Sequence, residues 1–283
     1  MTQKRDMHLH IPLFSRIMEK NMIFREDVDN MTVAILTGAS AGLGQSFFQA
    51  MCANGPQVDE IWLIARRRER LEEMAASAVD CKVRVLPLDL TVSDSFVALR
   101  ELLEQEKPDV RALINNAGFG KMGYVEELDP VEQGGMVDLN VRALTVLSAM
   151  VLPYMQKGAF VLNVCSIASF VPNPRMTVYS STKAYVLSFS KGLREEVKKR
   201  GVNVLALCPG PMRTEFLPVA GIAAGSSKTF DTLPYACPDR VAVLALKKAR
   251  QGRAVFTPLG FFKFYRVLAK LLPHNWLMKL AKV

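Results

Sequence analysis

Short apolar runs alternate with longer segments of helical periodicity along most of the chain. Seven runs have the length of strands: Met31–Thr37, Ile61–Ala65, Val83–Leu88, Val110–Ile114, Phe160–Cys165, Val202–Leu207 and Ala254–Phe256. The segments between them, such as Arg67–Ala78 and Ser93–Glu104, repeat apolar residues at the spacing of an amphipathic helix. Most of the strands are apolar on both faces, which is typical of a parallel sheet covered by helices on each side. The pattern therefore predicts an α/β fold with a doubly wound parallel seven-stranded sheet.

The chain of 283 residues shows no internal repeat or linker that would divide this sheet, so we expect a single domain over residues 31–257. Residues 1–30 precede the first strand and are interpreted as an N-terminal extension. The net charge of +9 is unevenly distributed. Residues 240–283 hold ten basic side chains and no acidic ones, whereas residues 31–239 hold 21 basic and 22 acidic side chains. The excess charge belongs to the C-terminal end, where residues 258–283 form a separate basic segment.

Composition excludes several classes of protein. The five cysteines lie far apart without a CxxC pair, which argues against a disulfide-stabilised secreted scaffold and for a reducing compartment. The three histidines lie near the chain ends, so we expect no zinc site and no other metal. No run of about 20 mainly apolar residues is present, and we expect no membrane-spanning helix. These features predict a cytoplasmic protein whose membrane association, if any, is confined to the surface.

A glycine-rich segment, Thr37–Gly44 (TGASAGLG), follows the first strand and opens the first helix. Gly38, Gly42 and Gly44 allow a sharp turn and let a pyrophosphate approach backbone N–H groups at the helix N-terminus. The G-x-x-x-G-x-G spacing is a variant of the dinucleotide-binding pattern. An ordinary strand-to-helix loop is the alternative, but the position after the first strand of such a sheet favours a dinucleotide site.

The end of the second strand indicates which dinucleotide is preferred. An acidic residue there would bind the ribose 2′-hydroxyl of NAD, whereas an arginine would pair with the 2′-phosphate of NADP. The sequence has Arg66 and no carboxylate at this turn, and a guanidinium binds phosphate through charge-assisted hydrogen bonds. Ser40 is expected to add a neutral hydrogen bond, and Arg68 and Arg70 are interpreted as the start of a solvated helix. We therefore predict a preference for NADP(H) over NAD(H).

Four polar residues form a candidate catalytic set. Tyr179 and Lys183 stand four residues apart and would share one face of a helix, where the ammonium should lower the pKa of the phenol toward the working range of a general acid. Ser166 follows a strand at the ligand-binding edge of the sheet and can donate a hydrogen bond to a carbonyl oxygen that becomes an alkoxide. Asn140 is placed to hold a water that links Lys183 to solvent. Each residue alone is weak evidence, but the set predicts carbonyl–alcohol chemistry.

With these residues in place, the chain resembles the short-chain dehydrogenase/reductase family. The resemblance rests on Thr37–Gly44, Asp89-Leu90, Asn115-Asn116-Ala117-Gly118, Asn140, Ser166, Tyr179 with Lys183, and Pro209-Gly210-Pro211-Met212-Arg213-Thr214. These motifs span residues 31–257 in the order and spacing of the family. The resemblance implies a Rossmann-like fold, an NADP(H)-dependent oxidoreductase and a homo-oligomer. One departure is that Ala41 supplies no second basic residue beside the glycine turn.

The resemblance also implies a role for each residue. Asn140, Ser166, Tyr179 and Lys183 would form a catalytic tetrad in which Tyr179 exchanges a proton with the substrate oxygen while hydride passes to or from the nicotinamide. The cofactor would be bound by Gly38, Ser40, Gly42, Leu43, Gly44, Arg66, Asp89, Leu90, Asn115, Ala117, Gly118, Tyr179, Lys183, Pro209, Gly210, Met212 and Thr214. Among these, Asp89 would contact the adenine, and Met212 and Thr214 would hold the carboxamide.

The substrate is expected to be a hydrophobic ketone or secondary alcohol. Apolar residues gather in three stretches, Phe119–Tyr124, Phe170–Met176 and Met212–Pro238, through Phe119, Met122, Phe170, Met176, Phe216, Leu217 and Phe230. Core packing explains many of them equally well. Gly221–Ser227 is small and polar enough to be a mobile lid. The alternative function is a non-enzymatic dinucleotide-binding redox sensor or scaffold, against which the intact catalytic set argues.

The C-terminal segment predicts an amphipathic helix. If Phe261–Leu272 is helical, Lys263, Arg266 and Lys270 fall within about 60° of one another, and the other nine residues are apolar. Such a helix could lie on a membrane, cap a subunit interface or close the substrate cleft, and the sequence leaves the three alternatives open. Binding to nucleic acid is not expected, because the basic residues belong to no recognisable reading module.

Overall fold

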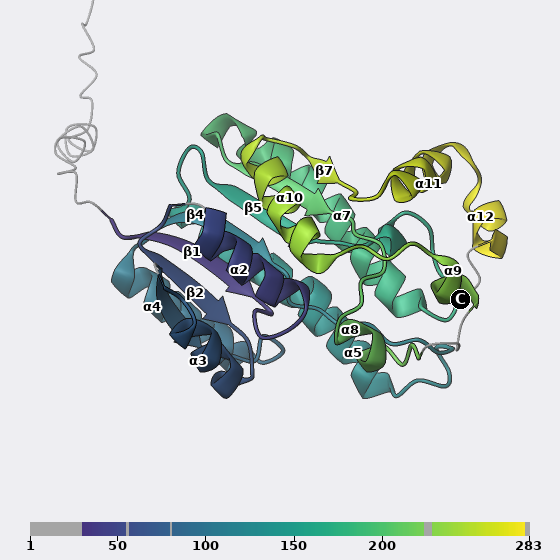
Figure 1. Ribbon diagram of the computed structural model, residues 1–283, viewed down its shortest axis with the longest axis horizontal. Coiled ribbons are helices and arrows are strands. Elements are labelled where there is room, and N and C mark those ends of the chain that lie inside the picture. The colour runs from purple at the N-terminus through teal and green to yellow at the C-terminus, as the bar shows by residue number, and fades with distance from the viewer. Residues whose placement is uncertain (1–29, 55–56, 80, 224–227, 281–283) are drawn as a thin grey trace, which may run out of the picture. The chain divides into compact units, whose positions relative to one another are not determined.

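Seven parallel strands form one sheet in the order β3-β2-β1-β4-β5-β6-β7 (Figure 1). The strands are β1 (Thr32–Thr37), β2 (Glu60–Ile64), β3 (Lys82–Leu86), β4 (Asp109–Asn115), β5 (Phe160–Val164), β6 (Asn203–Leu207) and β7 (Val255–Phe256). The computed structural model describes residues 30–54, 57–79, 81–223 and 228–280. It confirms the predicted Rossmann-like doubly wound sheet. The extension predicted for residues 1–30 lies, except for Asn30, outside the described residues.

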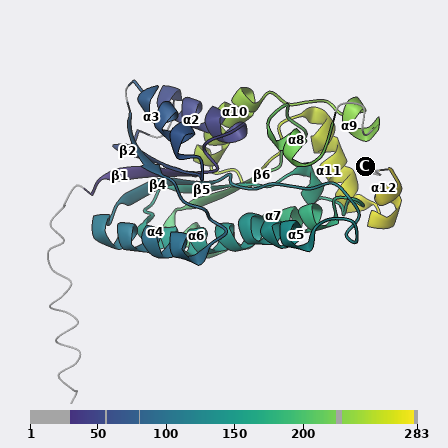
Figure 2. The same cartoon turned by 90° about the horizontal axis from the view of Figure 1, so that it is seen from below.

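Helices cover both faces of the sheet, as Figure 2 shows. One layer contains α2 (Leu43–Asn54), α3 (Arg68–Ala76) and α10 (Pro238–Arg250). The opposite layer contains α4 (Ser93–Glu106), α5 (Pro130–Val137), α6 (Leu144–Val151) and α7 (Thr177–Val197). The shorter helices α8 (Phe216–Val219) and α9 (Lys228–Thr232) precede α10, and α11 (Gly260–Leu271) and α12 (His274–Leu280) follow β7.

The side-chain alternation of the strands explains why two layers of helices are needed. In β1, Ala34 and Leu36 pack toward the layer of α2 and α10, whereas Val33 and Ile35 pack toward the layer of α4 and α6. All four are fully buried. Successive side chains of a strand point to opposite faces, so a strand that is apolar at every position is stable only when both faces are covered.

A continuous helical stretch, Pro130–Tyr154, is long and apolar enough by length and composition to cross a membrane. It comprises α5, a π-helical turn η1 (Asp138–Ala143), α6 and a 3₁₀ turn η2 (Leu152–Tyr154). Leu147 and Val151 of this stretch are buried in the core beneath the sheet. Packing within the α/β fold therefore accounts for its apolar character.

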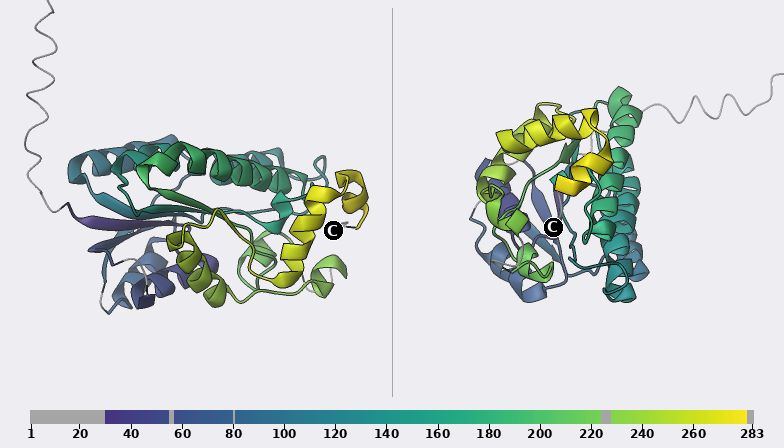
Figure 3. Two further views of the ribbon diagram at one scale, coloured as in Figure 1. Left: turned by 90° about the horizontal axis from the view of Figure 1, so that it is seen from above. Right: turned by 90° about the vertical axis from the view of Figure 1, so that its right-hand side faces the viewer.

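Helix α11 lies at the end of the sheet at which the strands terminate, as the two views of Figure 3 show. Its Phe262 is 1% exposed and packs so tightly on Gly210 that a Cβ at that glycine would overlap the ring. Phe264, two residues later on the same helix, is 64% exposed. The helix is thus attached through one face, and its other face is left in contact with solvent.

This packing predicts unequal effects for two identical substitutions. Phe262→Ala should lower the free energy of unfolding by about 3–5 kcal/mol, because it removes a buried ring and leaves a cavity. Phe264→Ala should change it by less than about 0.5 kcal/mol. Urea unfolding of both variants measures the difference. Equal, small effects would show that α11 is not docked on Gly210.

Candidate active site

A cleft of about 880 Å³ opens where the strand order reverses, at the carboxyl ends of β1 and β4. The chain leaves β1 toward α2 on one face of the sheet and leaves β4 toward α5 and α6 on the other face, so the loops that follow these two strands diverge and leave room for a ligand. The loops after β2, β5 and β6 and the helices α8 and α11 complete its walls. The cleft thus lies at the position where doubly wound sheets bind their ligands.

The glycine turn after β1 is held against the loop after β4. Gly38 has a φ of +64°, and a Cβ there would lie 2.7 Å from Cα of Ala117. The hydroxyl of Thr37 accepts hydrogen bonds from the backbone N–H groups of Asn116 and Ala117, both at 3.0 Å. Nδ2 of Asn116 donates in return to the carbonyl of Gly38 at 3.0 Å. The two loops form one rigid floor in front of the N-terminus of α2.

Most of the residues predicted for the site line this one cleft. They are Gly38, Ser40, Gly42, Leu43, Arg66, Asp89, Leu90, Ala117, Gly118, Ser166, Tyr179, Lys183, Pro209, Gly210, Met212 and Thr214. Gly44, Asn115 and Asn140 do not line it. Gly44 has a backbone role instead, because a Cβ there would overlap the carbonyl oxygen of Gly38.

Asn115, which was predicted to bind the cofactor, has a side chain that does not line the cleft. It is the last residue of β4, and its side chain is buried between β4 and β5. Nδ2 donates to Oδ1 of Asn163 at 2.9 Å and to Oγ of Ser148 at 3.2 Å. The strand alternation places the next residue, Asn116, at the cleft instead.

Asn140 is buried in the π-helical turn η1, directly behind the cleft wall. Its Oδ1 accepts from the backbone N–H of Phe119 at 3.0 Å, and its Nδ2 donates to the carbonyl of Phe119 at 2.9 Å and to the hydroxyl of Thr182 at 3.0 Å. The amide therefore fixes the loop after β4 to helix α7. A π-helical turn of this kind is often found at functional sites.

Ser166, Tyr179 and Lys183 meet at one end of the cleft. Tyr179 and Lys183 share a face of α7, with Nζ of Lys183 lying 5.8 Å from the centroid of the tyrosine ring. Nζ donates to the carbonyl of Val164 at 2.8 Å, at the end of β5. Ser166 follows that strand and its hydroxyl accepts from the backbone N–H of Ala168 at 3.1 Å. Tyr179 and Lys183 are only 7% and 5% exposed.

The pKa values of this pair differ from the sequence expectation. Burial raises the pKa of Tyr179 to about 12, an effect that a hydrogen bond with Ser166 opposes without cancelling. Burial also lowers the pKa of Lys183 to about 8, because the charged amine is removed from water. The neighbouring amine was expected to lower the pKa of the phenol, but desolvation is the larger effect on both groups.

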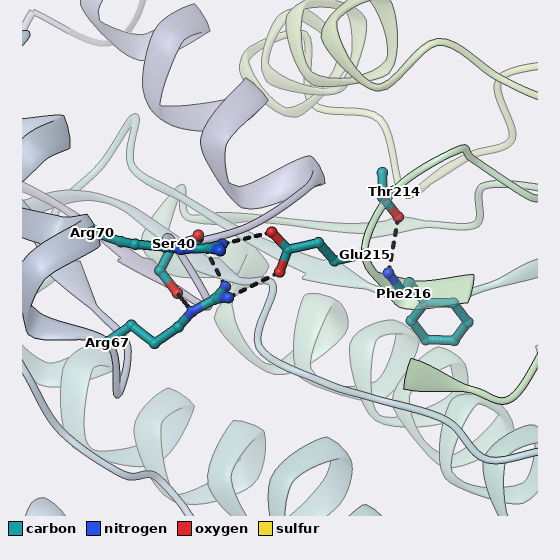
Figure 4. Close-up of polar contacts among 6 residues, drawn as sticks. All are labelled: Ser40, Arg67, Arg70, Thr214, Glu215 and Phe216. Atoms are coloured by element: carbon teal, nitrogen blue, oxygen red, sulfur yellow. Dashed lines mark hydrogen bonds and ion pairs between the residues drawn. The ribbon is translucent and has the colours of Figure 1, made fainter. Parts of the chain in front are cut away.

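The opposite end of the cleft carries a network of charges (Figure 4). Nε of Arg67 donates to the hydroxyl of Ser40 at 3.2 Å, and Nη2 of Arg67 donates to the carbonyl of Ser40 at 3.0 Å. Glu215 pairs with Arg67 at 2.9 Å and with Arg70 at 2.5 Å. The side chain of Arg66, predicted to bind phosphate, is 75% exposed and lies 4.0 Å from Asp89.

The remaining walls of the cleft are apolar. Among the predicted apolar residues, Phe119, Met176, Phe216, Leu217 and Phe230 line it, whereas Met122 and Phe170 do not. The C-terminal helices add Phe261, Phe262, Tyr265, Leu268 and Leu277. Of the three roles considered for the C-terminal helix, closing the cleft is therefore the one that this packing favours. The predicted lid at residues 221–227 lies partly outside the described residues.

Comparison with known proteins identifies the family. The family model described as short chain dehydrogenase matches residues 32–221, which include strands β1 to β6 and the residues Ser166, Tyr179 and Lys183. The chain belongs to the short-chain dehydrogenase family. An uncharacterized oxidoreductase of Staphylococcus saprophyticus is 33% identical over 187 residues, which cover 65% of this chain and 75% of that protein. This short-chain dehydrogenase is accordingly an oxidoreductase.

Two solved structures show how far the likeness extends. A short-chain dehydrogenase from Sphingobium yanoikuyae in complex with NADPH is 31% identical with a TM-score of 0.73, and the alignment covers 88% of this chain and 95% of that one. The bulky-bulky ketone specific alcohol dehydrogenase from Comamonas testosteroni is 28% identical with a TM-score of 0.70, covering 88% and 94%. The architecture is therefore shared over nearly the full length of both structures.

Sequence reasoning missed two residues of this short-chain dehydrogenase, Arg67 and Glu215. Arg67 neighbours Arg66, which was chosen in its place, whereas Asn116 belongs to the predicted Asn115–Gly118 segment but was not named individually as a cofactor-binding residue. Glu215 carried no signal, because its partners lie 145 and 148 residues earlier in the chain. Its position directly after the Met212–Thr214 motif was the available hint.

Because the amine of Lys183 is buried, we expect its replacement by methionine to stabilise the protein by an amount that depends on pH. The pKa of Lys183 is lower in the folded protein (about 8) than its usual value of 10.5, so wild-type stability rises with pH between these values. Lys183→Met should be more stable than wild type at pH 7 by about 1–3 kcal/mol. The difference should shrink as the pH approaches 10.5.

Urea unfolding at several pH values measures this difference, with the exposed Lys191→Met of the same helix as the control. The control should differ from wild type by less than about 0.5 kcal/mol, because it replaces an exposed side chain. A Lys183→Met protein that is less stable than wild type at pH 7 would contradict the argument that burial destabilises the charged amine.

Proposed function

We propose that this oxidoreductase uses NADP(H) to interconvert a hydrophobic ketone and the corresponding secondary alcohol, with Tyr179 as the general acid and base. The observation that carries the proposal is the placement of Ser166, Tyr179 and Lys183 at the apolar end of a cleft whose other end carries arginines. The cleft thus offers a proton-transferring group and a phosphate-binding group to one extended ligand.

The cleft fits a nicotinamide dinucleotide. The turn at Gly38 and Gly44 has no room for side chains, so its backbone N–H groups and the N-terminus of α2 stay open to a pyrophosphate. Asp89 and Leu90 would border the adenosine, and Arg66 and Arg67 with Ser40 would face the 2′-phosphate. Met212 and Thr214 would border the carboxamide. The NADPH bound by the Sphingobium yanoikuyae enzyme supports this assignment.

The catalytic end performs proton transfer. When bound, the nicotinamide supplies or accepts the hydride. Because its pKa is raised to about 12, the Tyr179 hydroxyl is protonated at neutral pH and can give its proton to a carbonyl oxygen. The hydroxyl of Ser166 stabilises the same oxygen by a hydrogen bond. Lys183 holds its charge next to the ring as the phenolate forms, and Asn140 keeps the loop at Phe119 in register with α7.

The apolar walls support a hydrophobic substrate. Phe216 packs against the Tyr179 ring with centroids 5.5 Å apart, and Phe119 and Leu268 lie in the same cleft. A substrate held there would be shielded from water on the side of the reacting carbon. The ketone specificity of the Comamonas testosteroni alcohol dehydrogenase supports the CH–OH class. A cytoplasmic location and a homo-oligomer are part of the same proposal.

Tyr179→Phe tests the catalytic assignment. Removal of the hydroxyl should lower kcat for ketone reduction by about 10²–10⁴-fold, because the group that gives the proton is lost. The dissociation constant of NADPH should change by less than about twofold, since the ring is retained. Stopped-flow reduction of an aromatic ketone and a fluorescence titration measure the two quantities. A variant that keeps most of its kcat would refute the role of Tyr179.

The choice of cofactor gives a second test. The ratio of kcat/KM for NADPH to that for NADH, measured with a panel of bulky ketones, should be at least about tenfold in favour of NADPH, as one charged phosphate contact is worth more than about 1.4 kcal/mol. A preference for NADH would refute the NADP(H) assignment. Binding of NADPH without turnover of any ketone or alcohol would instead fit a non-enzymatic sensor.

A further inference from the structure

Glu215 reaches the phosphate end of the cleft from the opposite wall. It stands at the start of α8, where the preceding Thr214 lies against Gly42 of the glycine turn, since a Cβ there would be 3.0 Å from Cβ of Thr214. From this position the carboxylate contacts Arg67 and Arg70 of the segment that follows β2, as Figure 4 shows. One oxygen is used for each arginine. The contact joins the segment after β2 to the start of α8.

The two arginines and Ser40 form a binding position for an anion. Arg67 is held in place by the hydroxyl and the carbonyl of Ser40, and its Nη1 points to the carboxylate. Arg70 supplies a second guanidinium on the other oxygen. Hydrogen bonds from both arginines lower the pKa of Glu215, so it is ionised at neutral pH. Two guanidinium groups beside a hydroxyl also suit a phosphate monoester.

We propose that Glu215 is a specificity-determining residue that competes with the 2′-phosphate of NADP(H) for Arg67 and Arg70. The inference rests on the proposed function, since it concerns the same dinucleotide. A dianionic phosphate beside the arginines would repel the carboxylate, so NADP(H) binding requires Glu215 to release them. NAD(H) has a hydroxyl at this position and leaves the carboxylate in place. Glu215 therefore weakens the binding of NADP(H) selectively and limits the preference for it.

The exposure of the three side chains shows whether Glu215 acts on cofactor binding or on the stability of the fold. Arg67, Arg70 and Glu215 are 42%, 43% and 48% exposed. Exposed ion pairs contribute about 0–1 kcal/mol to stability because water screens them. Loss of the carboxylate should thus leave the unfolding midpoint nearly unchanged, and its effect should be found in cofactor binding.

The test is a fluorescence titration of the full-length protein with NADPH and with NADH at low ionic strength, where exposed charges are screened least. Glu215→Gln should lower the dissociation constant of NADPH by about two- to tenfold, the range expected when exposed ion pairs no longer compete. That of NADH should change by less than about twofold. The control is Glu72→Gln, which removes the exposed pair between Glu72 and Arg68 outside the cleft and should change neither constant.

A double variant tests whether the gain in NADPH affinity comes from Arg70, once Glu215 no longer pairs with it. Arg70→Gln added to Glu215→Gln should cancel the gain in NADPH affinity, because the phosphate then loses the second guanidinium. Weaker NADPH binding by Glu215→Gln, or equal changes for the two dinucleotides, would overturn the proposal. Wild-type protein that binds neither dinucleotide would refute the proposed function together with this inference. Wild-type protein that binds NADH more tightly would refute only the NADP(H) preference, if Glu215→Gln still gains affinity for NADPH alone.

Discussion

The close approach of the loops after β1 and β4 is the contact on which the site depends. Thr37 accepts two backbone hydrogen bonds from the opposite loop, and the missing side chain of Gly38 lets that loop pass. If the loops were further apart, the N-terminus of α2 would no longer face Ala117 and Gly118. The phosphate end and the catalytic end would then belong to two shallow depressions, since both are built outward from this floor.

The charged groups at the two ends of the cleft differ in their exposure to water. At the phosphate end, Arg67 and Glu215 are solvated, so their charges are easily exchanged for those of a ligand. At the other end, Tyr179 and Lys183 are buried. Desolvation raises the pKa of Tyr179 and lowers that of Lys183, which favours the neutral form of each side chain. At neutral pH the charged Lys183 amine is therefore destabilising, because burial opposes its charge, whereas the phenol of Tyr179 is neutral in both the folded and the unfolded protein. The carbonyl of Val164 offsets part of this cost through its hydrogen bond with Lys183.

The sequence predicted the sheet and most of the site because both follow local rules. Continuous apolar runs define buried parallel strands, and the residues after their carboxyl ends meet at one edge whatever the details of the helices. It was less successful where a side chain had two possible directions. Asn115 and Asn116 are adjacent amides, and only the end of β4 decides which of them is buried. Arg66 and Arg67 present the same choice at the end of β2. The pKa of Tyr179 depends on burial, which a spacing of four residues does not report.

Gly210 belongs to the wall of the cleft and is also the position on which helix α11 packs. The motif around it was interpreted as part of the cofactor site, yet the absence of a side chain there is also what lets Phe262 of α11 pack against the loop. Helix α11 in turn places Tyr265 and Leu268 over the apolar end, while its basic residues Lys263 and Lys270 stay exposed. The loop at Gly210, which lines the cleft, therefore also supports the helix that closes the apolar end of the cleft. Because the buried Phe262 ring fills the space above Gly210, a displacement of the loop should be transmitted to α11 through this contact.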